Sequence, residues 1–330
     1  MVKYIVQTNG TQWCYNCWKS VADGNKIRFL EKAMPYTGNS LMYWLCYTHY
    51  RFRSPVLRLL PFTSIWYNKF KKTFNIDKDV DTVLIIYDWC FLTKDFKFLK
   101  KIRKDYPRLH IVYLFSNIVM VTGARLYRIL DKLNDNFDMV FAFDKEDAKQ
   151  YHFDHNPLIY TPPTKLPLYS DKLEFDLFYL GQAKDRYEQL MEIFEKARKE
   201  RLKCNFTIVG VPKEKRLYEG EISYERMTYS QALEIMGKSK CLVDAIQGES
   251  TALTIKTCEA VVLGRKLITT NENVIREPFY KEKNILLYNK DVSLKEFIEK
   301  NMEDYTEMDK SYFSPQGLFE KIEKRLGLKE

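Results

Sequence analysis

Short apolar runs alternate with helical patterns along the first half of the chain. The runs cover residues 2–6, 83–88, 111–115 and 139–143, and the second ends in Asp88. Continuous apolar runs of this length are typical of strands buried on both faces of a parallel sheet. Apolar residues at helical spacing follow them at 93–105, 122–134 and 145–151. Strand and helix therefore alternate, which predicts βαβ units.

The alternation restarts in the second half. Apolar runs cover 175–180, 204–209, 241–244, 266–270 and 284–288, and helical patterns cover 185–202, 229–237, 251–263, 294–301 and 318–328. Gly264 directly follows the third of these helical segments, where a glycine commonly ends a helix. This half therefore predicts a second parallel α/β domain.

A proline-rich stretch at 156–170 separates the two halves and is the best candidate for an interdomain linker. We predict an α/β protein with two Rossmann-like parallel-sheet domains. The N-terminal domain spans 1–160, the linker 161–172 and the C-terminal domain 173–330, with the last helix allowed to pack back on the N-terminal domain.

Charge is unevenly distributed along the chain. Residues 1–75 contain eleven Lys and Arg against two Asp and Glu, which accounts for the whole net charge of +9, and the remainder is balanced. Such an asymmetry points to an anionic partner of the first quarter: lipid headgroups, a phosphate-bearing acceptor or nucleic acid.

Cysteine usage and hydropathy indicate the compartment. The seven cysteines are odd in number and lie mostly in apolar runs, which is typical of reduced intracellular thiols. No secretory signal is visible, and no apolar stretch approaches the ~18–20 residues of a membrane span. We expect a cytoplasmic protein, with peripheral association at the inner face of the plasma membrane as a further expectation.

The first segment that carries chemistry is 179–186. Gly181 ends a predicted strand and lets a ligand approach the backbone, and the following helix would point its N-terminus at a phosphate. Lys184 and Arg186 add cations at the same position. The alternative is an ordinary strand-to-helix turn with surface charges.

The second segment is 244–264. A strand ends at Asp244, a small polar loop follows, and a helix is predicted from Thr251, with Ser250 or Thr251 as its cap. Lys256 and Glu259 are three residues apart and share a helix face. A carboxylate there can accept hydrogen bonds from ribose hydroxyls. The alternative, a solvated helix residue, is weakened by the apolar positions around Glu259.

Residues 259–271 resemble the glutamate–alanine to glycine–lysine to isoleucine–threonine stretch of bacterial GT-B glycosyltransferases. They are especially similar to lipopolysaccharide and capsular polysaccharide biosynthesis transferases. Residues 173–209 and 141–148 fit the same resemblance, which covers about half of the chain. It implies a GT-B fold with two domains facing a cleft, and transfer of a sugar from a nucleotide diphosphate sugar to a saccharide or lipid-linked acceptor.

The resemblance also implies roles for individual residues. Glu259 would hold the ribose, with Lys256 on the same face. The pyrophosphate would lie against Gly181, Lys184, Arg186 and the loop formed by Gly248, Glu249, Ser250 and Thr251. Retaining GT-B families carry two glutamates separated by seven residues, whereas nine residues separate Glu249 from Glu259. Retention and inversion therefore both stay open.

A metal-free mechanism is expected, because oriented amides and cations can stabilise the leaving diphosphate. No convincing Asp-x-Asp motif stands at a strand end, Cys14-x-x-Cys17 has no second pair, and the four histidines form no metal signature. No cofactor is predicted. An inverting enzyme needs a base, for which Asp88 is the best candidate and Asp23 and His49 are weaker ones.

Residues 51–72 interleave basic with aromatic and aliphatic residues. Such a segment suits a surface on anionic lipid or a charged acceptor, with a core helix bearing a solvated basic face as the alternative. The cations in question are Arg51, Arg53, Arg58, Lys69, Lys71 and Lys72.

Three other functions remain open. A GT-B-type sugar-nucleotide epimerase would turn over donor without any acceptor. A nucleic-acid-binding protein could use the basic, aromatic first quarter, although no recognised motif occurs and we expect no nucleic acid. A non-catalytic partner subunit is the third.

Overall fold

A computed structural model describes residues 2–8, 12–22, 26–30, 41–51, 63–90, 96–119, 129–161, 173–248 and 251–328. The chain divides into two compact units. The first comprises Met1–Asn156 and Leu318–Glu330, and the second Pro157–Gly317. The division therefore falls at the start of the proline-rich stretch 156–170, and the C-terminal segment from Leu318 belongs with the first unit.

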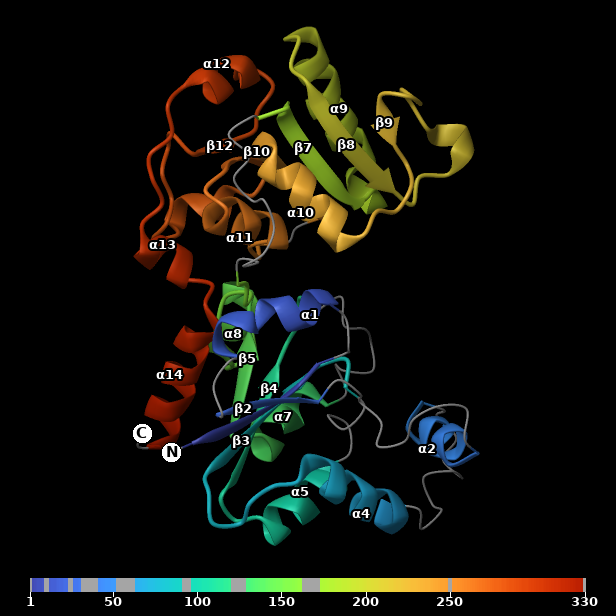
Figure 1. Cartoon of the computed structure of the whole chain (residues 1–330), viewed down its shortest axis with the longest axis vertical. Helices are drawn as coiled ribbons and strands as arrows, with labels where there is room; N and C mark the ends of the chain where they lie inside the picture. The colour runs from blue at the N-terminus through green and yellow to red at the C-terminus, as the bar shows by residue number, and fades with distance from the viewer. Residues whose placement is uncertain are drawn as a thin grey trace. The chain divides into compact units, whose positions relative to one another are not determined.

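The first unit contains a parallel sheet in the order β2-β1-β3-β4-β5-β6 (Figure 1). Its strands are β1 (Lys3–Gln7), β2 (Ile27–Leu30), β3 (Thr82–Tyr87), β4 (Leu109–Leu114), β5 (Met139–Ala142) and β6 (Asp154–His155). The central strand β3 is buried at its first five positions, as its uninterrupted apolar run predicts. Because the strands are parallel, their carboxyl ends meet at one edge of the sheet.

Helices cover both faces of this sheet. The helices of this unit are α1 (Gln12–Cys17), α2 (Leu41–Arg51), α4 (Thr63–Phe74), α5 (Phe96–Asp105), α7 (Leu133–Asn136) and α8 (Lys145–Gln150), together with most of α14 (Pro315–Leu326). Phe70 of α4 and Phe98 of α5 pack into one core with Leu84 of β3. Neighbouring positions face the other way: the ring of Tyr4 on β1 stacks on Phe319 of α14 with centroids 4.0 Å apart. Alternate strand residues thus supply two packed layers.

The second unit repeats this plan with strand order β12-β11-β10-β7-β8-β9. Its strands are β7 (Phe175–Gln182), β8 (Cys204–Val209), β9 (Ile222–Ser223), β10 (Ser239–Asp244), β11 (Lys266–Thr269) and β12 (Ile285–Leu287). All ten strand pairings in the described parts of the two sheets are parallel. The predicted α/β class with two parallel sheets is confirmed.

Helices of the second unit lie on both faces of β7. They are α9 (Tyr187–Lys199), α10 (Tyr229–Gly237), α11 (Ile255–Val262), α12 (Leu294–Glu299) and α13 (Glu307–Ser311). Leu177 and Tyr179 pack with the buried residues of α9 and α12. Phe178 packs with those of α10 and α11. This alternation places α11 and α9 on opposite faces of the strand that ends at Gln182.

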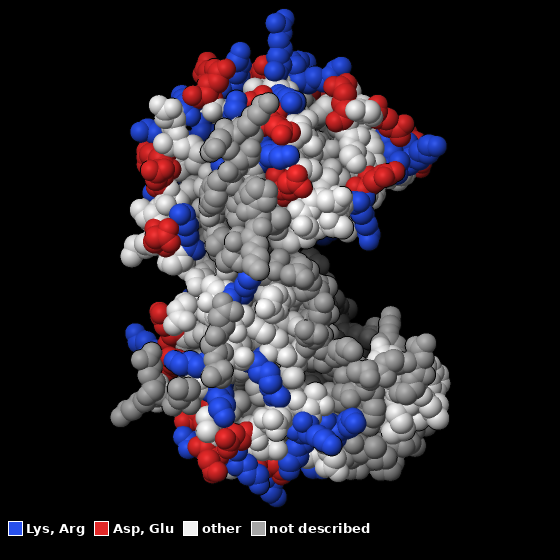
Figure 2. All heavy atoms as spheres, viewed as in Figure 1, with Lys and Arg blue, Asp and Glu red and all other residues white. Residues whose placement is uncertain are grey.

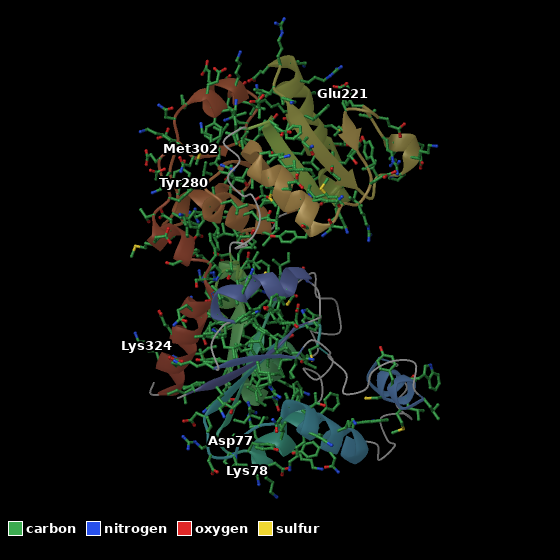
Figure 3. The ribbon with its side chains drawn as sticks, in the orientation of Figure 1. Asp77, Lys78, Glu221, Tyr280, Met302 and Lys324 are labelled. Carbon is green, nitrogen blue, oxygen red and sulfur yellow. The ribbon has the colours of Figure 1, made fainter. Side chains whose placement is uncertain are left out.

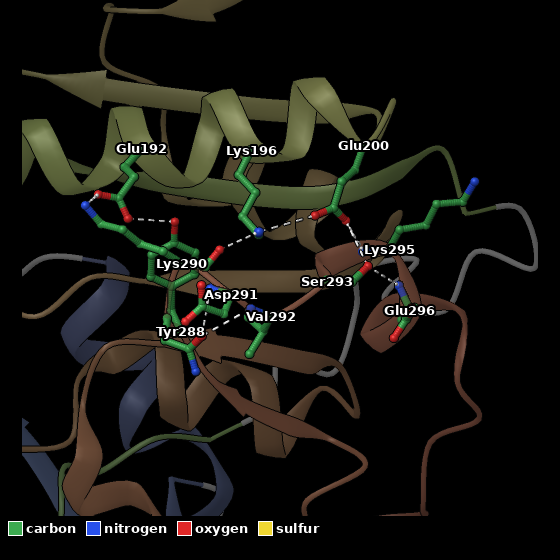
Figure 4. Close-up of polar contacts among 11 residues, drawn as sticks. Glu192, Lys196, Glu200, Tyr288, Lys290, Asp291, Val292, Ser293, Lys295 and Glu296 are labelled. Atoms are coloured by element: carbon green, nitrogen blue, oxygen red, sulfur yellow. Dashed lines mark hydrogen bonds and ion pairs between the residues drawn. The ribbon is translucent and has the colours of Figure 1, made fainter.

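Polar contacts along α9 fasten it to the loop after β12 (Figure 4). Glu192 accepts a hydrogen bond from the Tyr288 hydroxyl at 2.8 Å and pairs with Lys290 at 3.0 Å. About two helical turns further on, the Glu200 carboxylate accepts from the backbone N–H of Lys295 in the first turn of α12 at 2.6 Å. These contacts hold α9 at several points, which fixes the direction of the helix that follows the Lys184–Arg186 turn.

Two sequence-based boundaries need correction. The helix predicted from Thr251 begins at Ile255, and its cap is Thr254, whose hydroxyl accepts from the backbone N–H of Lys256 at 3.1 Å. Ala252 and Leu253 are buried, so the chain enters the core before the helix starts. Of the helix predicted at 122–134, the described residues form a 3-10 turn (Leu130–Lys132) and the short α7.

Candidate functional site

Two loops of the second unit meet at the carboxyl ends of β7 and β10. The Lys184 ammonium donates to the Gln247 side-chain oxygen at 2.6 Å, and the Arg186 guanidinium donates to the carbonyl of Ala245 at 2.6 Å. The two segments singled out by sequence, near 181–186 and 244–248, are therefore in direct contact. Their contact gathers two cations and the loop amides at one edge of the sheet.

The backbone of both loops takes conformations that fit a tight turn. Lys184 has a φ of 43° and Gly248 a φ of 53°. The left-handed region is natural for glycine but unfavourable for lysine, so the Lys184–Gln247 contact must offset backbone strain. A methyl group on Gly248 would lie 3.5 Å from the Asp185 carboxylate, an ordinary contact distance. Gly248 is thus required for its φ angle rather than for space. Glu249 and Ser250 lie outside the described residues.

Asp244, at the carboxyl end of β10, is buried between threonine side chains. The hydroxyls of Thr257 and Thr269 each lie 3.3 Å from its Oδ2 atom. Burial raises the pKa of Asp244, opposed by the Thr254 hydroxyl and the charge of Arg186. Asp244 therefore connects the start of α11 to β11 and fixes the loop that carries Gln247.

The N-terminus of α11 faces the same group of loops. Thr254 caps it, Lys256 lies in its first turn, and Thr251 precedes it as a half-buried residue. A helix N-terminus presents unpaired N–H groups and a partial positive charge, which favour an anion. Together with Lys184 and Arg186, it gives this edge of the sheet a positive character.

Glu259 lies one turn further along α11 and is only 1% exposed. Its Oε2 pairs with the Lys256 ammonium at 2.5 Å, and its Oε1 accepts from the Tyr229 hydroxyl at 3.1 Å. The Tyr160 hydroxyl lies 3.0 Å from the Tyr229 hydroxyl, so Tyr160, Tyr229 and Glu259 form a hydrogen-bonded chain. Glu259 is therefore not a solvated helix residue. Lys256 shares its face, as predicted, and the two form a buried ion pair.

Tyr179 is a residue that sequence reasoning missed. Its side chain is 2% exposed, and burial raises the pKa of its hydroxyl to about 12, against the lowering effect of the nearby Arg186 guanidinium. A methyl group on Gly181 would lie 2.5 Å from that hydroxyl. The available signal was the spacing: residues two apart on a strand share a face. The Tyr179 side chain therefore occupies the space that a Cβ atom at position 181 would need, which explains the glycine there.

We expect Gly181→Ala to destabilise the second unit by about 1–3 kcal/mol, because the new methyl group overpacks against Tyr179. Chemical denaturation followed by circular dichroism measures the loss. Gly317→Ala is the control, since a methyl group there meets no atom within 4 Å. Equal stability of the Gly181 and Gly317 variants would contradict the packing argument.

In the first unit, Asp88 follows β3 directly and is 8% exposed. Its Oδ1 accepts from the Ser116 hydroxyl at 2.6 Å and from the Trp89 backbone N–H at 3.0 Å. Burial raises the pKa of Asp88, against the lowering effect of these bonds. Asp23 lies outside the described residues, as does the side chain of His49. Asp88 is held as a buried carboxyl with an elevated proton affinity, a property that suits a general base.

The predicted basic surface residues have different environments. Lys69 and Lys72 are exposed on α4, whereas Lys71 pairs with Asp105 at 2.8 Å. The side chain of Arg51, and both Arg53 and Arg58, lie outside the described residues.

No metal-ligand cluster is found among the described residues. In those residues no three His, Cys, Asp or Glu side chains converge. Residues 77–79 match an Asp-x-Asp pattern, but Asp77 and Lys78 lie in the loop that precedes β3 and not at the carboxyl end of a strand (Figure 3). Across the same residues, none of the helices combines the length and the apolar character needed to cross a bilayer.

Several solved structures share this fold. Sucrose-phosphate synthase from Thermosynechococcus elongatus matches with a TM-score of 0.55 and 10% identity over 99% of both chains. Anabaena Alr3699/HepE, in complex with UDP and glucose, matches with a TM-score of 0.55 and 11% identity over 99% of both chains. Trehalose-6-phosphate synthase OtsA gives a TM-score of 0.51 and 11% identity over 94% of each. The chain therefore has the GT-B fold. No family model and no curated protein sequence matches it.

Proposed function

We propose that this protein is a glycosyltransferase that uses a nucleotide diphosphate sugar as donor. The observation that carries the proposal is the contact between the 182–186 and 245–248 loops, which collects Lys184, Arg186 and the N-terminus of α11 at one sheet edge. A diphosphate is the group that this combination of cations and amides suits. The GT-B fold and the neighbour in complex with UDP and glucose support the same reaction class.

The donor would lie with its diphosphate against Gly181, Lys184, Arg186 and the turn at Gly248. These groups would stabilise the negative charge that develops on the leaving diphosphate, and the proposed mechanism needs no metal. Asp88 is the proposed base for the acceptor hydroxyl. The proposed acceptor is a surface polysaccharide or a lipid-linked oligosaccharide, in keeping with the resemblance of residues 259–271.

Glu259 is the proposed ribose ligand, and its environment adds a condition to that role. Each of its oxygens already has one partner and retains acceptor capacity for a second hydrogen bond. Because it is 1% exposed, ribose hydroxyls reach it only if the side chains that cover it rearrange. Donor binding should therefore be accompanied by a change at Tyr229 or Lys256.

A thermal-shift panel of uridine, guanosine, cytidine and thymidine diphosphates and their sugars tests the proposal. A ligand at a hundredfold its dissociation constant should stabilise the protein by about 2.7 kcal/mol. Arg186→Gln should lower the affinity for the preferred ligand by about 10–100-fold, because a hydrogen bond to a charged group contributes about that much.

Arg198→Gln is the matched control, because Arg198 is an exposed arginine that pairs with Glu221. If both variants bind the preferred ligand with the same loss of affinity, the proposed diphosphate site at Arg186 is contradicted. No shift with any nucleotide would contradict the function. Donor turnover without acceptor would point to the epimerase reaction instead.

A further inference from the structure

Three helices at one end of the first unit combine exposed apolar and basic side chains. Cys46 of α2, Phe70 of α4 and Phe98 of α5 belong to one core cluster, which ties the helices together. Their sequences contain nine Lys and Arg and one Asp. In the view of Figure 2, basic side chains lie over α4 and α5. The three helix sequences therefore carry a net charge of +8.

The lysines of α5 form a stripe that the overall charge balance conceals. Lys97, Lys100, Lys101 and Lys104 are all exposed and lie three or four residues apart, so they share a helix face. The opposite face, with Phe98, Leu99 and Ile102, is buried. Within the described residues, no ion pair is found for Lys97, Lys100 or Lys104, whereas the Lys101 ammonium lies 4.1 Å from the centroid of the Tyr67 ring. The stripe is available to an anionic partner.

The exposed face of α2 is apolar. Leu41 is 70% exposed, Trp44 59% and Leu45 36%, and the three lie at positions i, i+3 and i+4. Met42 beside them is 38% exposed. Large apolar side chains that gather on one helix face mark an interaction site, whereas single exposed ones need no explanation.

We infer that α2, α4 and α5 form a docking surface for an anionic lipid membrane. Tryptophan and aliphatic side chains enter the interfacial layer, and neighbouring lysines bind phosphate headgroups. A second copy of this chain would bring two lysine stripes together, so a homodimer through this surface is disfavoured by repulsion. Nucleic acid would account for the lysines but not for exposed Leu41, Met42 and Leu45. The inference does not rest on the proposed transfer reaction, because docking needs no donor.

Co-sedimentation of the full chain with vesicles tests this surface. Phosphatidylglycerol-rich vesicles should retain the protein, and phosphatidylcholine vesicles should not. Neutralising Lys97, Lys100 and Lys104 to Gln should lower partitioning about a hundredfold. Leu41→Ser with Leu45→Ser should lower it about tenfold or more, because each loses apolar area buried in the interface.

Matched controls come from the second unit. Lys199, Lys213 and Lys215 are exposed, and their joint change to Gln removes the same charge. Leu217 and Ile275 are 48% and 47% exposed and provide the control for the leucines. Trp44→Phe should keep vesicle binding but reduce the blue shift of tryptophan emission. All the altered side chains are exposed, so each variant should keep the parent circular dichroism spectrum.

Retention by neutral vesicles equal to that by anionic ones would overturn the inference, as would no retention by either. An equal loss in the control variants would do the same. Loss of polyuridylate binding in the lysine variant, with the leucine variant behaving like the parent on vesicles, would assign the surface to nucleic acid.

Discussion

Replacing Lys256 with Met is expected to destabilise the second unit by about 3–5 kcal/mol, because it leaves the Glu259 carboxylate buried without its counter-charge. Glu259 is 1% exposed and Lys256 8%, so solvent cannot replace the missing partner. Glu259→Leu should cost a similar amount by leaving the ammonium unpaired. The double variant Lys256→Met with Glu259→Leu should recover most of the loss, since apolar replacement of a buried pair is often neutral.

The tryptophan distribution separates the two units in this measurement. All five tryptophans lie at or before position 89, so their fluorescence reports on the first unit alone. Urea unfolding followed by circular dichroism reports on both units. Each single variant should shift the dichroism transition and leave the fluorescence transition in place. Single variants as stable as the parent would show that the ion pair is not a buried element of the fold.

The same double variant tests the ribose role of Glu259. It lacks the carboxylate but should remain folded, so the thermal shift with the preferred nucleotide can be compared directly with that of the parent. We expect the shift to disappear. A full shift in this variant would remove Glu259 from the proposed donor site. The diphosphate site near Lys184 and Arg186 is tested separately by Arg186→Gln.

Buried strands were predictable because each one appears in the sequence as a continuous apolar run. The run that ends at Asp88 and the run at 204–209 correspond to β3 and β8 within a residue or two. The short edge strands β6 and β9 were not predicted. Each has only two residues, too few for any periodic pattern, and its pairing is set by the neighbouring strand.

The start of α11 was predicted too early because the sequence offers several equivalent caps. Thr251 and Thr254 are both good capping residues, and only the burial of Ala252 and Leu253 decides between them. That burial depends on the β10 and β11 side of the core, which is a tertiary property. Local sequence therefore identified the helix but not its first residue.

The candidate site was predictable only as far as neighbouring residues determine it. Lys256 and Glu259 are three apart, and their shared face follows from helix geometry. Tyr229 contacts Glu259 across thirty positions, and Gln247 contacts Lys184 across sixty-three. Such contacts are set by strand order, which no local pattern records. The lysines of α5 were visible locally, because they alternate with Phe and Leu at helical spacing, but acidic residues cancel their charge in the sum over residues 76–330.

Replacing Asp88 with Asn is expected to slow sugar transfer by about 10²–10⁴-fold, the usual contribution of a general base. The fold should tolerate the change, because the asparagine oxygen can still accept from the Ser116 hydroxyl and the Trp89 N–H. Stability at neutral pH should be unchanged or slightly higher, since a costly buried charge is removed. Initial rates with the preferred donor, together with urea unfolding, measure both effects.

The pH dependence separates a base from a structural carboxyl. Burial raises the pKa of Asp88 in the folded protein, so folding favours its protonated form. Its contribution to stability is therefore present below the ordinary pKa of aspartate and is lost as the pH rises through the raised value. Activity should move the opposite way, falling as the pH drops through that same value, because only the carboxylate accepts the proton of the acceptor hydroxyl.

Asp88→Asn should abolish both the pH dependence of stability and that of activity. Ser116→Ala, which removes a hydrogen bond to the charged form, should raise the pKa and shift the acidic limb of the rate profile upward. A parent profile whose acidic limb is unchanged in Ser116→Ala, or an Asp88→Asn variant with parent rates, would assign Asp88 to the fold alone.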